Sequence, residues 1–414
     1  MKQNTGTMTM KIQNISKFGC SLLTTAILTA PTVLASNSLA DGITNALTDS
    51  KTKVSFRARY EGVDEDGAAG AKDKDGAALT LRSRLTLNTG TYNGLSFGVE
   101  IDNVTALIDD YNDLTFDYSG DDSVVADPEI TDINQAYLKY VRGDLKATFG
   151  RQRILHNNQR FVGGVGWRQN EQTYDGVRVQ YQANDALSFD YSYIHNANRI
   201  FGDAKRGTDL GGEFHFVNAA YKLNKQHKVT AFAYMLDFDT AAALSTSTYG
   251  LLYSGKFGKA FINASAASQS DNSDNPNSFD ASYLNAEIGS KFGKVTVLAG
   301  YELLGSDKGV GFSTPFATLH KFQGWADKFL GTPGEGVKDI YVTAKTKVKG
   351  IALAATYHNL TSDTGSKDWG NELDLVAKYK FSKNYGLLIK YANYSADDKS
   401  TDTSKLWVQA TAKF

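Results

Sequence analysis

Apolar and polar side chains alternate one by one along most of the chain after residue 51. In Val54-Ser55-Phe56-Arg57-Ala58 the apolar residues share one parity and the polar residues the other, and residues 79–87 and 95–102 repeat the pattern. Successive side chains of a β-strand point to opposite faces, so each segment predicts a strand with one apolar and one polar face. A chain built mainly of such segments is predicted to be all-β.

The connections between the predicted strands alternate between short and long. Short ones are predicted at 88–94, 142–144, 183–186, 224–227, 255–259, 291–294, 348–350 and 381–384. Long ones are predicted at 103–132, 152–173, 196–212, 237–247, 268–280, 305–338, 359–370 and 395–404. Tight turns at one end and long loops at the other are typical of a transmembrane antiparallel β-barrel of an outer membrane, with short periplasmic turns and long extracellular loops. The count is about 18 strands, with a margin of about two strands because the segments around Thr230 and Ala260 alternate poorly.

Proline gives an independent check on this assignment. It cannot donate a ladder hydrogen bond, so a closed barrel should exclude it from every strand. Pro128, Pro276, Pro315 and Pro333 all fall in predicted long connections. The positions of these residues favour a closed barrel.

The N-terminus resembles a secretory signal. Lys2, Lys11 and Lys17 precede an apolar stretch at 18–34, and small residues allow cleavage after Ala35 or Ala40. The alternative is a membrane anchor, which the short run and its internal proline disfavour. We therefore expect a signal peptide at 1–40 and the outer-membrane β-barrel at 41–414. The single cysteine lies within the signal, so no disulfide, thiolate chemistry or Cys-ligated metal is expected in the rest.

The chain ends in a strand-like segment, 406–414, that alternates up to a terminal Phe414. A final amphipathic strand with an aromatic last residue resembles the signal that outer-membrane proteins present to the barrel assembly machinery. The alternative is an ordinary exposed last strand. We expect Phe414 to be an assembly signal.

The polar faces of the predicted strands are rich in arginine and lysine. Barrels of 16–18 strands leave an aqueous passage, so these faces should line a water-filled lumen. Arg57, Arg59, Arg82 and Arg84 are predicted to line the pore. Rings of basic side chains bias a pore toward anions, and an anion preference is therefore one hypothesis. The other is that charges of both signs hydrate the wall and pair across strands.

Two stretches resemble the alginate-export-type outer-membrane porin family. They are the series 150–154, 165–170 and 174–178, and the block 320–329 (His-Lys-Phe-Gln-Gly-Trp-Ala-Asp-Lys-Phe). The resemblance implies an 18-stranded barrel with an electropositive constriction that conducts an anionic polysaccharide. By position it implies Arg151, Arg153, Arg168 and Arg178 as constriction residues, or as residues that hold an inward-folded loop. This sequence departs from that resemblance in one respect: all its predicted periplasmic turns are short, so no long turn that could plug the pore is predicted. The departure favours a porin-like member of the family over a dedicated polysaccharide exporter.

The expected function is a porin for passive diffusion of small hydrophilic solutes, anionic ones by hypothesis. The alternatives are an exporter of an anionic polysaccharide such as alginate and, from another class, an outer-membrane barrel enzyme. No catalytic constellation stands out, the six His show no metal-ligand spacing, and no cofactor is expected. Expected partners are outer-membrane lipid, the barrel assembly machinery and the solutes, with no nucleic acid. The protein is expected in the outer membrane of a Gram-negative bacterium. Its expected assembly state is a monomer or a trimer.

Overall fold

The computed structural model describes residues 36–67, 72–116, 118–202, 209–398 and 400–414. Residues 1–35, including most of the predicted signal, lie outside this part. A helix, α2 (Ser36–Thr48), occupies a stretch for which the sequence predicted no element, and the proposed cleavage after Ala40 falls within it. The signal and its cleavage site stay predictions. Among the described residues no helix is both long and apolar enough to cross a membrane.

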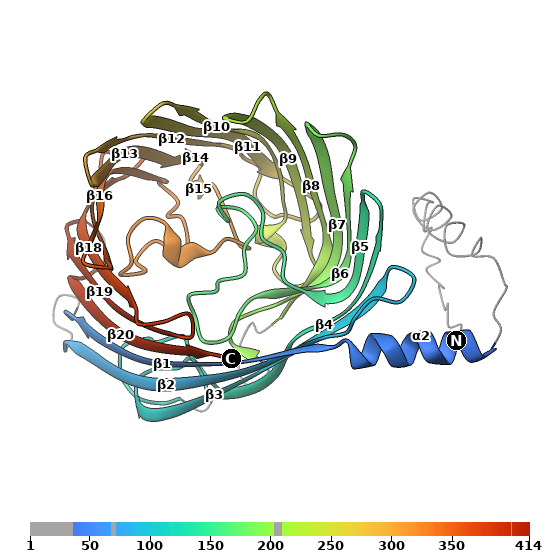
Figure 1. Cartoon of the computed structure of the whole chain (residues 1–414). Helices are drawn as coiled ribbons and strands as arrows, with labels where there is room; N and C mark the ends of the chain where they lie inside the picture. The colour runs from blue at the N-terminus through green and yellow to red at the C-terminus, as the bar shows by residue number, and fades with distance from the viewer. Residues whose placement is uncertain (1–35, 68–71, 117, 203–208, 399) are drawn as a thin grey trace, which may run out of the picture. The chain divides into compact units, whose positions relative to one another are not determined.

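The described residues after α2 form one closed antiparallel barrel of 18 strands, which confirms the predicted fold (Figure 1). Each strand pairs with its neighbours in the chain, and the last strand returns to the first. The barrel strands are β1 (Lys51–Glu65), β2 (Lys74–Asn88), β3 (Leu95–Asp110), β4 (Ile130–Arg142), β5 (Leu145–Gln152), β6 (Thr173–Gln182), β7 (Leu187–Asn198), β8 (Asp209–Lys222), β9 (His227–Phe238), β10 (Thr246–Phe257), β11 (Ala260–Asp271), β12 (Asp280–Phe292), β13 (Val295–Leu304), β16 (Val337–Val348), β17 (Ile351–Thr361), β18 (Asp368–Lys380), β19 (Tyr385–Ala396) and β20 (Thr403–Lys413).

The barrel closes between β1 and β20. Arg59 pairs with Gln409 in this register, and the backbones of Val54 and Phe414 exchange two hydrogen bonds of 2.8 and 3.0 Å. Within lipid, every backbone polar group must find a partner inside the protein, so strands that cross a membrane must close into a barrel. The pairing of β1 with β20 makes that closure. Phe414 lies at this seam, with its ring 5.8 Å from that of Tyr385.

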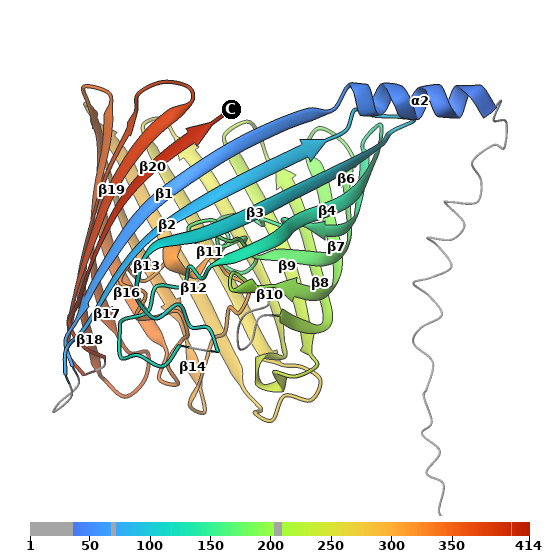
Figure 2. The same ribbon diagram turned by 90° about the horizontal axis from the view of Figure 1, so that it is seen from below.

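The connections follow the predicted asymmetry, and Figure 2 shows the long ones gathered at one end of the barrel. The longest connection, between β13 and β16, holds a small hairpin of β14 (Ser306–Asp307) and β15 (Val310–Gly311) and a 3₁₀ turn, η3 (Leu319–Lys321), where the sequence predicted only loop. All four prolines that follow residue 51 lie outside the strands, as predicted. In the two-residue turns Gly258 and Gly293 adopt φ of 63° and 60°, a left-handed conformation that glycine takes without strain.

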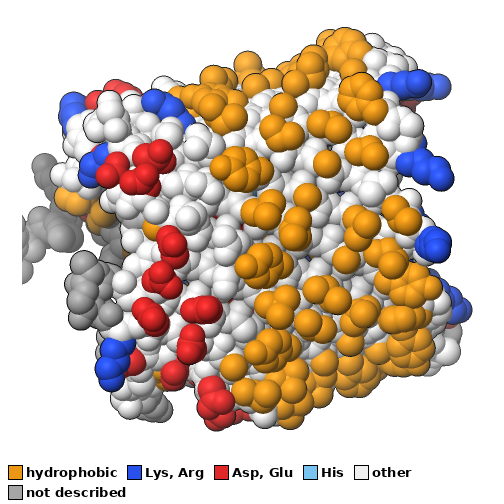
Figure 3. Space-filling model, turned by 90° about the vertical axis from the view of Figure 1, so that its left-hand side faces the viewer, with side chains coloured by type: hydrophobic (Ala, Val, Ile, Leu, Met, Phe, Trp, Pro, Cys, Tyr) orange, Lys and Arg blue, Asp and Glu red, His pale blue; other side chains and the backbone are white. Residues whose placement is uncertain are grey.

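A belt of apolar side chains crosses the face of the barrel seen in Figure 3, and exposed large apolar residues occur on strands from β1 to β20. Leu251, Ile288 and Val342 are each at least half exposed, which a water-facing sheet would not tolerate as a continuous band. Phe257, Phe292, Phe381 and Tyr385 stand next to the short turns, and acidic side chains gather at the opposite, loop-bearing edge. A closed barrel with such a belt is an outer-membrane barrel, so the Gram-negative outer membrane is its location.

The inner wall differs from the prediction of a uniformly polar lumen. Toward the long-loop ends of β8 and β9, six inward side chains are apolar and fully or almost fully buried: Phe214, Phe216, Phe232, Tyr234, Leu236 and Phe238. They pack on Phe316 from the β13–β16 connection, with the rings of Phe214 and Phe316 5.0 Å apart. Alternation is poor around Thr230 because this part of the wall is apolar on both faces.

The orientation of β10 gives a test of the fold. Leu251 faces outward and is 58% exposed, whereas its neighbour Leu252 lines a cavity in the lumen. We expect Leu251→Arg to lower the free energy of unfolding by about 2–4 kcal/mol, the usual range for arginine near the bilayer midplane. The matched control Leu252→Arg should cost less. Reversible urea unfolding from lipid vesicles measures both, and an equal loss would contradict the assigned faces.

Candidate functional site

Two of the long connections fold into the barrel instead of standing outside it (Figure 1). The first inward loop comprises residues 153–172, between β5 and β6, and the second comprises residues 305–336, between β13 and β16. They meet inside the lumen: Gly163 N donates to Phe316 O at 2.8 Å, and Thr318 N donates to Gln159 O at 3.0 Å. Together they form the constriction.

Three arginines of β1 and β2 fix the backbone of the first inward loop. Arg57 Nη1 donates to Gly166 O at 3.1 Å, Arg57 Nε donates to Gln169 Oε1 at 2.8 Å, and Arg57 Nη2 also reaches Arg168 O. Arg59 donates to Trp167 O at 2.5 Å, and Arg82 donates to Gln169 O at 3.2 Å. The planar guanidinium offers several donors in a fixed geometry, which suits a run of carbonyl oxygens. These side chains project from the inner face of the wall, and all three are at least 90% buried beneath the loop, so their predicted role as pore-lining residues stays a prediction.

Carboxylates connect Arg84 of β2 and Arg153, the first residue of this loop, to the wall and to each other. Arg84 pairs with Asp102 at 2.5 Å and with Glu171 of the loop at 2.9 Å. Arg153 pairs with Glu100 of β3 at 2.8 Å and also with Glu171. Glu171 thus joins an arginine of the wall to an arginine of its own loop, and partly buried pairs of this kind are screened little by salt.

Two arginines of the first inward loop hold the second. Arg160 pairs with Glu302 of β13 at 2.8 Å and donates to Thr314 and Gln323 of the second loop at 3.1 and 3.2 Å. Arg168 bridges Glu61 of β1 at 3.0 Å and Asp327 of the second loop at 2.9 Å. Because each guanidinium joins two or three segments, the loops and the wall form one network.

A buried lysine of β19 is enclosed by aromatic rings from both loops. Lys390 Nζ lies 4.2, 3.6 and 5.1 Å from the ring centres of Trp167, Trp325 and Trp407. Its ammonium also lies 2.6 Å from His320 Nε2. Cations are attracted to the faces of aromatic rings, most strongly to tryptophan, so this cage attaches both loops to β19 and β20.

The protonation state of His320 follows from its surroundings. Burial lowers the pKa of His320 to about 3, against the opposing influence of Asp327, whose carboxylate lies 2.7 Å from Nδ1. A neutral imidazole has one donor and one acceptor, so Nδ1–H donates to Asp327 and Nε2 accepts from Lys390. The ring therefore relays a hydrogen bond from wall to loop at neutral pH.

The backbone of the second inward loop also docks on a wall carboxylate. Ala326 N donates to Glu372 Oε1 of β18 at 2.8 Å, and Trp325 N donates to the same oxygen. Gly324 has a φ of 84°, and a Cβ there would collide with the Glu372 carboxylate. Only glycine fits this close approach without displacing the loop.

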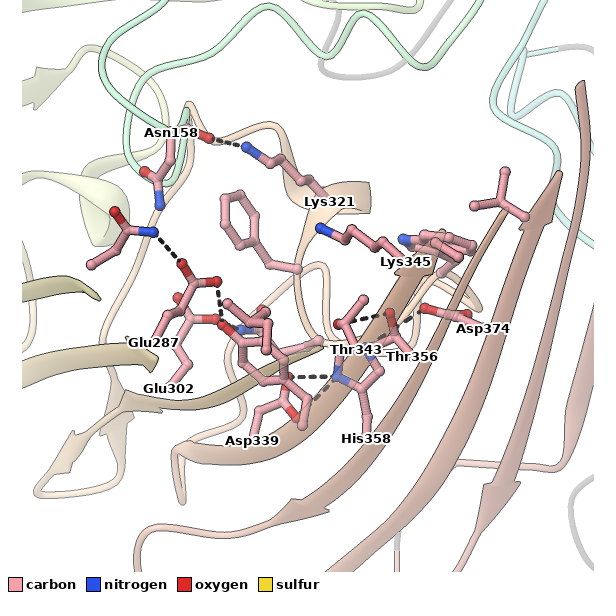
Figure 4. Close-up of a pocket in the computed structure, with 18 of the residues that line it drawn as sticks. Asn158, Glu287, Glu302, Lys321, Asp339, Thr343, Lys345, Thr356, His358 and Asp374 are labelled. Atoms are coloured by element: carbon pink, nitrogen blue, oxygen red, sulfur yellow. Dashed lines mark hydrogen bonds and ion pairs between the residues drawn. The ribbon is translucent and has the colours of Figure 1, made fainter. Parts of the chain in front are cut away.

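Cavities lie on both sides of the constriction. One, of about 440 Å³, is lined by Arg168, Arg199, His320 and Lys405 among others, and includes residues of the long-loop end. The other, of about 750 Å³, is lined by β12, β13, β16, β17 and β18 and by residues 321–325 of the second loop (Figure 4). It shares Asn158, Asn263, Asn285 and Glu287 with a third space of about 500 Å³ that reaches the β8–β9 turn.

The remaining arginines implied by the family resemblance lie away from the constriction. Arg178 pairs with Asp190 on the neighbouring wall strand at 2.5 Å. Arg151 pairs with Asp175 at 3.0 Å and shares the parity of the outward-facing Phe149. Among the described residues no group of three or more His, Cys, Asp or Glu side chains is placed to hold a metal ion.

Sequence reasoning missed the partners of the two loops. Lys390, Trp407 and Glu372 come from strands far along the chain, and their sequence signal is only an inward parity in an alternating segment. The block 320–329 was recognised by resemblance, but its contacts with these strands were not. A lysine and a glutamate on inward parity are the only sequence features that could have pointed to them.

Comparisons with known proteins agree with this architecture. Residues 50–247 match the family model for alginate export, which confirms the family resemblance seen in the sequence. A sequence search of curated proteins gives no match. Similar solved structures include Pseudomonas aeruginosa OccK3 (OpdO), with 14% identity, TM-score 0.68 and coverage of 91% of this chain and 99% of the other.

Two further structures are similar to the same extent. Pseudomonas aeruginosa OpdK, solved with vanillate, has 14% identity, a TM-score of 0.69 and coverage of 89% and 99%. Acinetobacter baumannii OccAB4 has 15% identity, a TM-score of 0.68 and coverage of 89% and 100%. At such low identity the likeness establishes the shared fold.

The arginine contacts predict how the constriction responds to mutation. Arg57→Ala removes hydrogen bonds to the first inward loop that contribute about 1.5–3 kcal/mol each. We expect a higher mean single-channel conductance and more current noise in planar bilayers, because the loop is held less firmly. Arg142→Ala, at the exposed end of β4, is the matched control. Unchanged conductance in both Arg57→Ala and the double variant Arg57→Ala/Arg82→Ala would contradict the anchoring role.

Proposed function

We propose that this chain is a porin through which small hydrophilic solutes diffuse passively across the outer membrane. One observation carries the proposal: a wide closed barrel holds cavities, lined in part by charged side chains, on both sides of a constriction built from its own loops. Barrels of this size enclose an aqueous passage, and folded-in loops set the size of what passes. The charged side chains that line the described interior would contact solutes as they pass, and we propose no catalytic role for them.

An anion preference remains part of the proposal. Lys222, Lys225 and Lys228 line the space near the β8–β9 turn, and Lys345 and Lys378 line the adjoining cavity. Basic side chains around a narrow aqueous passage raise the local concentration of anions. The arginines at the constriction contribute less to this preference, because most are paired with carboxylates.

Export of an anionic polysaccharide such as alginate is the second candidate, and the family match over residues 50–247 favours it. Two observations weigh against it. Every turn at the short-turn end has at most six residues between its strands, so no long turn is available as a plug. Both inward loops are attached to the wall by several charged contacts, so a polymer would have to displace them.

The proposed partners follow from the surface and the last strand. The apolar belt fits outer-membrane lipid, and the terminal strand ending in Phe414 fits recognition by the barrel assembly machinery. Monomer and trimer are the assembly states that the proposal allows, and chemical cross-linking in detergent distinguishes them.

Channel activity is the direct test. We expect the refolded protein to give steady, ohmic single-channel currents in planar bilayers and to admit small sugars and organic anions in liposome swelling. Heat-denatured protein is the control. A barrel that inserts but never conducts would overturn the porin proposal, whereas efflux of uronate oligomers at rates similar to those of monomers would favour polysaccharide export.

The assembly signal has its own test. Phe414→Ala removes the terminal aromatic ring but leaves the backbone hydrogen bonds to Val54 in place. We expect a several-fold fall in heat-modifiable barrel recovered from outer membranes, with little change in refolding from urea into detergent. Phe292→Ala, an exposed aromatic next to another short turn, is the control. Equal losses in the two variants would argue against a specific signal at Phe414.

A further inference from the structure

A groove of about 530 Å³ lies on the outer surface of the barrel wall, between β13 and β19. Its large apolar lining residues are Val295, Leu353, Leu375, Ile389 and Tyr391. Leu375 follows Asp374, which lines a cavity of the lumen, and Ile389 precedes Lys390, which contacts the inward loops. Successive strand side chains point to opposite faces, so the groove opens toward lipid and is part of the apolar belt.

Three alanines give the groove its depth. Ala344 of β16 pairs with Ala355 of β17, and Ala377 of β18 pairs with Leu353. Their methyl groups rise less from the sheet than the larger side chains around them, which leaves a gap between those side chains. Ala355 lies four residues from the start of β17, about 13 Å along the strand, so the groove lies within reach of the short-turn edge.

A flexible hydrocarbon chain is the occupant that suits this shape and place. Atoms that line a narrow gap lose dispersion contacts when nothing fills it, and a bulky rigid partner could not follow the gap between the large side chains. The belt in which the groove lies faces the acyl chains of the membrane. The open question is which lipid the groove would hold, and the charges near it bear on that.

Basic charge is concentrated on the same part of the short-turn edge. The turns that follow β8, β10, β12, β16 and β18 each contain one lysine and no acidic residue: Lys225, Lys259, Lys294, Lys349 and Lys383. The turns that follow β2, β4 and β6 contain no basic residue, and two of them contain an aspartate. Figure 3 shows basic side chains along the edge opposite the acidic one. Such an edge attracts anionic headgroups.

Three of these lysine turns border the groove. Val295, which directly follows Lys294, lines the groove, and the hydroxyl of Thr346 donates to Lys294 O at 3.1 Å. Lys349 is in the next turn along the wall and Lys383 in the one after it, and strands about 4.8 Å apart place successive turns about 10 Å apart. Within the described residues none of the three ammonium groups has an ion pair or a hydrogen bond. Their flexible four-carbon stems can bring them toward one phosphate.

We propose that this face of the barrel binds an anionic diacyl phospholipid of the periplasmic leaflet. One acyl chain lies in the groove over Ala344, Ala355 and Ala377, and the phosphate lies at Lys349, with Lys294 and Lys383 on either side. The short turns of an outer-membrane barrel are periplasmic, which places these lysines at the headgroups of the phospholipid leaflet. The inference goes beyond the proposed function, because it concerns the lipid that the barrel holds and not the solute that it passes.

Two lipids with the same acyl chains separate the headgroup from the groove. The refolded barrel in detergent is mixed with equal amounts of dioleoyl phosphatidylglycerol, which is anionic, and dioleoyl phosphatidylethanolamine, which is zwitterionic. Native mass spectrometry then counts the lipids that stay bound. We expect the anionic adduct to exceed the zwitterionic one by at least about tenfold, because one basic side chain near an anionic headgroup contributes about fivefold. The double variant Lys294→Gln/Lys349→Gln should remove most of this excess.

The chain supplies a matched control for the charge. Residues 256–259 and 291–294 both read Lys-Phe-Gly-Lys, and Lys259 holds in the β10–β11 turn the place that Lys294 holds in the β12–β13 turn. The variant Lys225→Gln/Lys259→Gln removes two charges from the same edge but farther from the groove, and should leave the lipid ratio nearly unchanged. Equal adducts of the two lipids on the unsubstituted barrel, or equal effects of the two double variants, would overturn the proposal.

A second pair of variants tests the groove itself. Ala355→Phe fills it without a change of charge and should remove the bound lipid, with Ala377→Phe as the alternative if the first variant does not fold. Ala231→Phe, outside the groove and opposite the outward-facing Leu251, should keep the lipid. Heat-modifiable migration identifies folded barrel in each case. Lipid retained by folded Ala355→Phe, or a dimer mass that this substitution abolishes, would contradict a lipid site, the latter in favour of a second copy of the chain.

Discussion

Backbone closure is the constraint on which the rest of this structure depends. In lipid no water is available to an unpaired N–H or C=O group, so a chain that crosses with strands must pair every strand on both sides. The alternating sequence, the exclusion of proline from the strands and the seam between β1 and β20 all serve that requirement. A tube of 18 strands then has an interior too wide for wall side chains to fill. The two inward loops occupy that space.

Two different kinds of contact hold the loops inside the lumen. On the side of β8 and β9 the wall is apolar, and aromatic rings pack on Phe316 much as in a soluble core. On the side of β1 and β2 the wall presents arginines, which donate to loop carbonyls and pair with loop carboxylates. Hydrophobic packing is nondirectional, whereas guanidinium groups fix position and direction. The two together hold the loops in one place.

Much of the fold was predictable because its signals are local. Alternation, turn spacing and proline placement each depend on a few neighbouring residues, and they predicted the strand count and the two kinds of connection. Poor alternation near Thr230 had a tertiary cause, because the apolar inner wall packs on a loop about 90 residues further along the chain. The inward direction of Arg57, Arg59 and Arg82 was likewise predictable from parity. Their partners were not, since Gly166, Trp167 and Gln169 reach them only through a loop conformation that no local pattern encodes.

The cage around Lys390 has a consequence for the order of assembly. Its rings come from the first inward loop, the second inward loop and the last strand, while its cation comes from the strand before the last. None of these contacts exists until β19 and β20 are in place. A barrel that lacks these two strands therefore lacks one of the several attachments of the loops. The last contacts of the two inward loops are therefore made by the same two strands that close the barrel, so closure of the wall and fixation of the loops share residues.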